Sequence, residues 1–165
     1  MNYGTGKFSG EEWFDTVTLA PGLVISQQSI GVASSSTGIS NVDGILGVDP
    51  VDLTYGTVGF CLPFCMSVPT VSDNLFKQGK ISEEVLGVYF VPSSEPSTTG
   101  KLTFGGPDNS VITSSVNYVP LTKTSPASYY WGIDGSISYG GTTILSSTAG
   151  IVDTGTTLVL LATGE

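Results

Sequence analysis

One short stretch of the chain has the residue types of a catalytic turn. Asp153 lies in the run Ile151-Val-Asp-Thr-Gly-Thr-Thr157, after two β-branched apolar residues and before a second apolar run at 158–161. Gly155 is expected to allow a backbone conformation that a side chain would forbid. The pattern predicts a carboxylate held at a turn between two hydrophobic strands, which suits a general base that activates water.

That chemistry needs a second carboxylate, and the chain contains no other Asp-Thr-Gly or Asp-Ser-Gly. A single acid cannot give and take a proton in the same step. The simpler alternative is an ordinary β-turn in which the Asp153 side chain accepts a backbone hydrogen bond. The tripeptide alone does not decide between the two.

The composition predicts an all-β protein with one or two short helices. Of the 165 residues, 39% are hydrophobic and 12% are charged, with 22 Gly and 9 Pro. Short apolar runs alternate with Gly-, Ser- and Thr-rich turns, which is typical of strands rather than of helical bundles.

The charge balance excludes several classes of function. Fourteen acidic residues stand against five basic ones, and the net charge is −9 with no histidine. No basic patch is available for nucleic acid. Without histidine there is no Ser-His or Cys-His mechanism, and a metal site or other cofactor is not expected. At about pH 3 most carboxylates would be neutral, so the self-repulsion of the chain in acid would be mild.

The two cysteines and the chain start give further expectations. Cys61 and Cys65 enclose a Leu-Pro-Phe stretch and either form a disulfide or remain two thiols in a loop. No basic and apolar leader follows Met1, and no apolar run reaches the length of a membrane span. The sequence therefore predicts no signal peptide in this chain and no membrane partner.

The turn residues predict the order of the elements. A meander is expected over residues 3–33, with strands at 8–19 and 23–30 around a Pro21-Gly22 turn. A helix is expected over 70–79, with Thr70 as its cap and Gly79 at its end, and a helical turn at 82–85. Further strands are expected at 42–48, 87–91, 100–104, 116–121, 129–139 and 142–145, the last two joined by Gly140-Gly141.

Several motifs, in the same order along the chain, resemble the pepsin-like aspartic endopeptidases, most nearly the secreted acid proteases of fungi. They are Tyr3-Gly-Thr-Gly6, Asp43-Gly-Ile-Leu-Gly47, Asp73-Asn-Leu-Phe76, Leu102-Thr-Phe-Gly-Gly106, Tyr130-Trp131 and the turn Ile151–Thr157. The resemblance implies a pepsin-like bilobal acid protease fold, incomplete in both lobes. Residues 1–109 would be the back half of the N-terminal lobe, starting at the flap, and residues 110–165 the front half of the C-terminal lobe.

The same resemblance assigns residue roles. Asp153 would be the second-lobe catalytic carboxylate, with Gly155 and Thr156 lining the cleft beside it. Tyr3 would cover a peptide substrate, while Gly4 and Thr5 would supply backbone hydrogen bonds to it. Ile45 and Ile151 would form subsite walls, and plain core packing is the alternative for this pair.

The resemblance also implies an endopeptidase that cleaves peptide or protein substrates at apolar residues, is secreted to the extracellular space and is monomeric when complete. Its first catalytic turn would lie upstream of residue 1, so this chain is expected to be an inactive fragment. The alternatives are a noncatalytic peptide-binding module and an active homodimer through two copies of Asp153. Residues 58–66 depart from the family, as an insertion or as untranslated sequence read as coding.

Overall fold

The computed structural model describes residues 6–39, 41–59, 67–92, 94 and 99–162, and this part of the chain is built mainly from strands. The chain divides into two compact units, Met1–Ser115 and Val116–Glu165. The predicted all-β class with short helices is confirmed. The predicted division between residues 109 and 110 remains a prediction about lobes, because the compact units are defined by packing alone.

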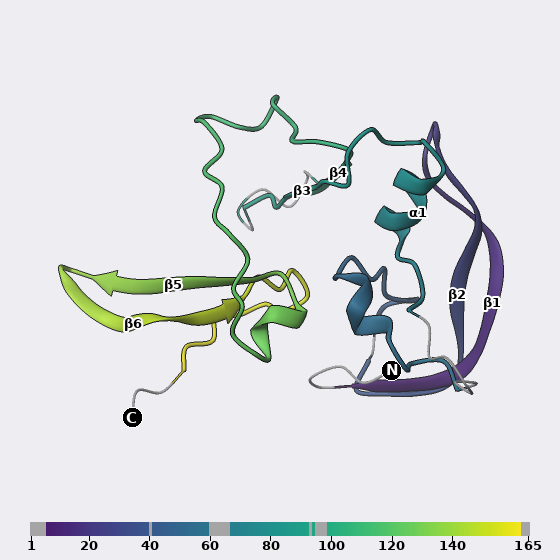
Figure 1. The fold of residues 1–165 in the computed structure, drawn as a ribbon, viewed down its shortest axis with the longest axis horizontal. Helices are drawn as coiled ribbons and strands as arrows, with labels where there is room; N and C mark the ends of the chain where they lie inside the picture. The colour runs from purple at the N-terminus through teal and green to yellow at the C-terminus, as the bar shows by residue number, and fades with distance from the viewer. Residues whose placement is uncertain (1–5, 40, 60–66, 93, 95–98, 163–165) are drawn as a thin grey trace. The chain divides into compact units, whose positions relative to one another are not determined.

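The first unit begins with a long antiparallel hairpin of β1 (Lys7–Ala20) and β2 (Leu23–Thr37). Figure 1 shows the two strands as a long curved ribbon. They are joined at the predicted Pro21-Gly22 turn, where Gly22 has a φ of +84°. Positive φ is readily adopted by glycine, which explains why the chain reverses here. Both predicted strands are confirmed, and β2 runs further than expected.

A short helix covers part of this hairpin. Helix α1 (Val71–Lys77) begins at the predicted cap: the Asp73 amide donates to the Thr70 hydroxyl, and the Thr70 amide donates to the Asp73 carboxylate. Gly79, at a φ of +65°, follows the end of the helix. The helix packs on β2 through a small buried cluster of Ile25, Val71, Leu75 and Ile81.

Buried polar groups tie the same helix to the hairpin. The Asn74 side-chain amide donates to Gln28 Oε1 at 3.0 Å, and the Gln28 amide donates to the Pro69 carbonyl at 3.2 Å. Gln28 and Asn74 are both buried. Because each polar group has a partner, the contact fixes the position of α1 on β2 without an unpaired buried group.

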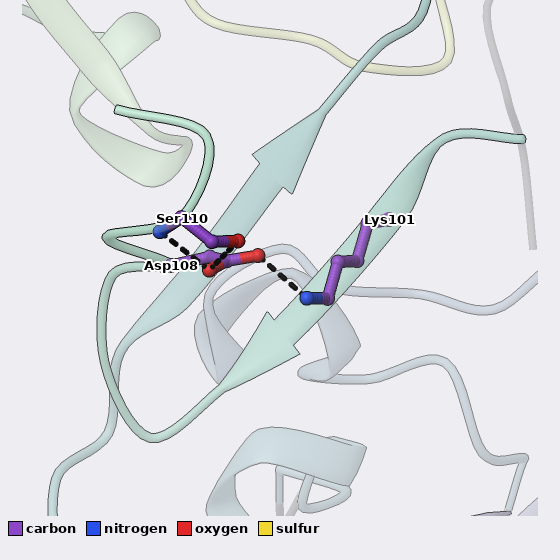
Figure 2. A network of polar contacts seen from close by, with 3 residues as sticks. All are labelled: Lys101, Asp108 and Ser110. Carbon is purple, nitrogen blue, oxygen red and sulfur yellow. Dashed lines mark hydrogen bonds and ion pairs between the residues drawn. The ribbon is translucent and has the colours of Figure 1, made fainter. Parts of the chain in front are cut away.

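The first unit also contains the small antiparallel pair β3 (Leu86–Tyr89) and β4 (Lys101–Phe104). The loop after β4 folds back onto it. The Lys101 ammonium lies 2.6 Å from Asp108 Oδ2. Ser110 donates to Asp108 Oδ1 through both its amide (3.0 Å) and its hydroxyl (2.6 Å). Figure 2 shows the three side chains and these contacts. A single carboxylate thus holds the turn at both ends.

The second unit consists mainly of one hairpin. At the open end of the hairpin, residues 122–132 form a corner, the segment that leads through a short 3₁₀ turn into the first strand. Strands β5 (Gly132–Tyr139) and β6 (Thr142–Ile151) are antiparallel. Gly140 and Gly141, with φ values of +57° and +80°, form the predicted two-residue turn. The 3₁₀ turn η2 (Ala127–Tyr129) lies beside the open end of this hairpin (Figure 1).

Several predicted elements were wrong. Residues 42–48 and 116–121 are not strands. Residues 82–85 contain a bend at 82–83 and no helical turn. The two apolar segments have no partner strand in the described part of the chain, and a strand needs one to satisfy its backbone. A four-residue helix is too short to offset the cost of nucleation. The predicted strand over 129–139 begins only at Gly132, because η2 occupies its start, and the strand predicted over 142–145 extends to Ile151.

The sheets are small and leave apolar surface uncovered. Within the described residues each sheet contains two strands, and some large apolar side chains are mostly exposed, Tyr118 to 81% and Val159 to 84%. The 3₁₀ turn η1 (Val51–Thr54) adds no fully buried residue. No helix in the described ranges is long and apolar enough to cross a membrane.

Candidate catalytic carboxylate

The candidate site is the turn that follows β6. The strand ends at Ile151, and the next amide, that of Val152, donates to the Trp131 carbonyl at 2.9 Å. This bond continues the pairing of the hairpin by one step after the Gly132–Ile151 pair. Asp153 is therefore the first residue to leave the hairpin, which anchors the turn on one side.

Two short hydrogen bonds hold the Asp153 carboxylate. The Gly155 amide donates to Oδ1 at 2.8 Å, and the Thr156 hydroxyl donates to Oδ2 at 2.6 Å. The Thr156 amide also donates to the Asp153 carbonyl at 3.4 Å. Each carboxylate oxygen has one donor, so the orientation of the group is defined while the side chain stays exposed. The backbone bond of the simple turn interpretation is present, and it is compatible with a catalytic carboxylate.

These bonds also set the charge of the site. The Thr156 hydroxyl, and after it the Gly155 amide, lower the pKa of Asp153 below its ordinary value, while partial desolvation acts in the opposite direction. Hydrogen bonds to a carboxylate favour its ionised form. These two hydrogen bonds therefore favour the anionic form of Asp153, and no cation contributes among the described residues.

The predicted reason for the glycine was wrong, although Gly155 does contact Asp153. Gly155 is not among the glycines with positive φ. The constraint is one of space, since a Cβ at this position would come within 3.2 Å of Asp153 Oδ1. A glycine here lets the backbone amide approach the carboxylate closely.

The structure brings together only some of the predicted site residues. Asp153, Gly155 and Thr156 form one turn, and Ile151 ends the strand before it with its side chain 47% exposed. Ile45 belongs to the other compact unit and is 52% exposed. Neither isoleucine is buried in this chain. Both interpretations of the pair, subsite walls and core packing, stay predictions.

The remaining predicted positions lie outside the described residues. These are the flap residues Tyr3, Gly4 and Thr5, and the cysteines Cys61 and Cys65. Their predicted roles, including the disulfide, stay predictions. Within the described ranges, no three His, Cys, Asp or Glu side chains are grouped so that they could hold a metal ion.

The sequence did not indicate the hydrogen bonds that join Thr122 to strand β5. Thr122 is buried, with 5% exposure, and its hydroxyl donates to Asp134 Oδ1 at 2.7 Å. Its amide donates to the Gly132 carbonyl at 2.9 Å. A threonine in a segment expected to be loop and an aspartate on an exposed strand position give no signal by spacing, because the contact depends on how the chain folds between them.

Comparison with known families identifies the class of protein. The family model described as eukaryotic aspartyl protease matches residues 1–165, the whole chain. The chain therefore belongs to the eukaryotic aspartyl protease family, a family of peptide hydrolases. The resemblance inferred from the motifs is confirmed.

Individual relatives agree with this assignment. The chain is 59% identical to polyporopepsin of Irpex lacteus over 165 residues, and the match covers 98% of this chain and 47% of that protein. Rhizopuspepsin-1 of Rhizopus niveus is 37% identical, with 98% of this chain and 39% of that protein covered. The chain thus spans less than half the length of these curated relatives.

A solved structure supports the fold. The crystal structure of the aspartic proteinase from Irpex lacteus matches with a TM-score of 0.92 and 58% sequence identity, covering 98% of this chain and 47% of that one. The predicted pepsin-like fold, present as a partial chain, is confirmed. The fragment interpretation is consistent with this coverage.

Proposed function

We propose that this chain carries one half of the catalytic site of an aspartic endopeptidase, with Asp153 as one of two carboxylates that share a proton. The observation that carries the proposal is the Asp153 turn: the Gly155 amide and the Thr156 hydroxyl orient both carboxylate oxygens and lower the pKa of the group. Membership of a protease family supports the same role.

The reaction follows from the chemistry of a carboxylate pair. Two like charges at close range cannot both ionise, so one carboxyl stays protonated, as is general for aspartic proteases. The ionised member takes a proton from a bound water, and the protonated member donates to the peptide carbonyl as the water oxygen attacks. The product of this step is a tetrahedral intermediate, and no acyl-enzyme forms.

The substrate contacts are part of the proposal. An extended peptide would lie across the Asp153 turn, with Gly155 and Thr156 beside the scissile bond. Ile45 and Ile151 present exposed apolar side chains suited to apolar substrate residues. Tyr3, Gly4 and Thr5 would cover the peptide from the flap.

The complete protein would be a secreted, extracellular monomer that acts in acid. The two relatives named above are fungal pepsins, which supports a secretory route. The low content of basic residues supports tolerance of acid, because protonation of the carboxylates leaves little net charge. The noncatalytic alternative finds no support among these relatives.

The test compares the 165-residue chain with the protein encoded by the complete transcript. We expect the complete protein to cleave an extended apolar peptide in acid, and the 165-residue chain to cleave none, since it supplies one carboxylate. Asp153→Asn in the complete protein should abolish cleavage. Cleavage by the 165-residue chain alone, rising with the square of its concentration, would instead support the homodimer, and a complete protein without an upstream catalytic aspartate would refute the proposal.

A further inference from the structure

We propose that Thr122 and Asp134 are positioning residues for Asp153, acting through the open end of the β5–β6 hairpin. Their catalytic consequence rests on the proposed function above. Their effect on the geometry of the Asp153 turn can be measured without it.

Thr122 is connected in three ways, all within the second unit. Its amide donates to the Gly132 carbonyl at 2.9 Å, and its hydroxyl donates to Asp134 Oδ1 at 2.7 Å. The same hydroxyl accepts from the Thr124 amide at 3.2 Å. A buried hydroxyl that uses its donor and an acceptor site in this way fixes the corner in one arrangement.

The start of β5 is pressed against this corner. Gly132 is buried, and a Cβ placed on it would lie 2.3 Å from the Ala127 carbonyl oxygen and 2.8 Å from Thr122 Cγ2. A real Cβ would therefore clash with backbone as well as side-chain atoms. The closeness means that a movement of Thr122 is transmitted to the backbone at Gly132.

The hairpin carries this constraint to the catalytic turn. Gly132 pairs with Ile151, Asp134 pairs with Ala149, and the Val152 amide donates to the Trp131 carbonyl at 2.9 Å. The ends of a two-stranded hairpin open most easily, because the last pairs have neighbours on one side only. Thr122 adds bonds to β5 at the end where β6 leads into Asp153.

The residue types favour a positioning role over simple packing. Valine would fill the volume of Thr122, but it would leave the Thr124 amide without its acceptor and Asp134 without its donor. Asp134 is exposed and makes no contribution to the buried core. The Thr122–Asp134 pair therefore orients strand β5 through a hydrogen bond and adds little buried apolar area.

The first test uses the 165-residue chain. In Thr122→Val we expect the amides of Val152 and Gly155 to exchange with solvent about tenfold faster. The pKa of Asp153, followed by its ¹³C-carboxyl shift, should rise toward its ordinary value, because a looser turn weakens the bonds that lower it. Thr122→Ser should restore both properties.

The matched control is Thr143→Val, which makes the same change at an exposed position of β6. It should alter neither the exchange rates nor the Asp153 titration. If Thr122→Val behaves like Thr143→Val in both measurements, the inference is wrong. Should Thr122→Val fail to fold, Asp134→Ala carries the test at an exposed site, with the same expected shifts and the same refuting outcome.

The second test uses the complete protein. Thr122→Val should lower kcat about tenfold with little change in KM, and should move the acid limb of the pH profile to higher pH. A purely structural defect would reduce the amount of active enzyme and leave that limb in place, which would refute the inference. If the complete wild-type protein proves inactive, the proposed function fails, while the exchange and titration results still decide the positioning role.

Discussion

Asp108 and Asp153 sit in turns built almost alike, one in each compact unit. In both, the backbone amide two residues later donates to Oδ1, from Ser110 at 3.0 Å and from Gly155 at 2.8 Å. In both, a nearby hydroxyl also donates at 2.6 Å. Ser110, two residues after Asp108, donates to Oδ1, and Thr156, three residues after Asp153, donates to Oδ2. Local geometry alone would give the two acids the same role.

The two aspartates differ in that a lysine pairs with only one of them, Asp108. Lys101 lies 2.6 Å from Asp108 Oδ2 and, with Ser110, lowers the pKa of Asp108 to about 2 (Figure 2). The pKa of Asp153 is lowered by hydrogen bonds, with no charge contributing among the described residues. The charge of an ion-paired carboxylate is balanced by its cation, and such a group holds the fold together. An oriented carboxylate without a cation can still exchange a proton with water or substrate.

The largest difference should appear in catalysis. Asp153→Asn should lower the kcat of the complete protein by about a thousandfold or more, since it removes one member of the acid–base pair. Asp108→Asn should leave kcat within about threefold of the wild type, because its carboxylate is committed to Lys101 and Ser110. Steady-state assays on an extended peptide measure both. Equal losses from the two variants would erase the distinction.

The next difference lies in what sets each pKa. Thr156→Val should raise the pKa of Asp153 and lower kcat about tenfold, because the hydroxyl is the main cause of the lowered value. Thr156→Ser keeps a hydroxyl and should keep the pKa. Carboxyl ¹³C titrations resolve the change, and an unshifted Asp153 in Thr156→Val would contradict it.

The ion pair of Lys101 with Asp108 should affect how the free energy of unfolding of the first unit changes in acid. Asp108 has a folded pKa of about 2 against 3.8 for the free group, so its stabilising contribution is present above 3.8 and is lost as the pH falls toward 2. Lys101→Met should raise the pKa of Asp108 and shift that loss to higher pH. Urea midpoints between these pH values test it, with Asp108→Asn as the variant that should lack the dependence.

A third acid should show the smallest effect, with the opposite sign. Glu84 has its pKa raised above 4.5, first by a hydrogen bond to Asp73, then by burial and by repulsion from the same carboxylate. Its contribution is therefore present below about 4.5 and is lost as the pH rises through the folded pKa. Glu84→Gln should remove this dependence, and Glu83→Gln should not. A stability that rises with pH in this window in the wild type, but not in Glu84→Gln, would reverse the assignment.

Elements with complete local signals were predicted well. The Pro21-Gly22 and Gly140-Gly141 turns, and the Thr70–Asp73 cap of α1, depend on residues close together in the chain. Turn glycines and capping hydroxyls act over three or four residues, so every residue that takes part in the contact can be read from one short stretch of sequence. The motifs also identified the family, because their order along the chain is itself evidence.

Elements that depend on distant partners were predicted poorly. Residues 42–48 and 116–121 have the composition of strands, yet they form none in the described part of the chain. A strand exists only when another segment accepts and donates its hydrogen bonds, and composition does not say whether that segment is present.

The same division applies to the acids. The turn at Asp153, with Gly155 and Thr156 beside the carboxylate, could be predicted from the sequence because those contacts span at most three residues. The contacts of Lys101 with Asp108 and of Thr122 with Asp134 become visible only in the folded chain, since each joins residues brought together by intervening loops or strands. A carboxylate takes its charge from every group within a few ångströms, and folding places some of those groups there.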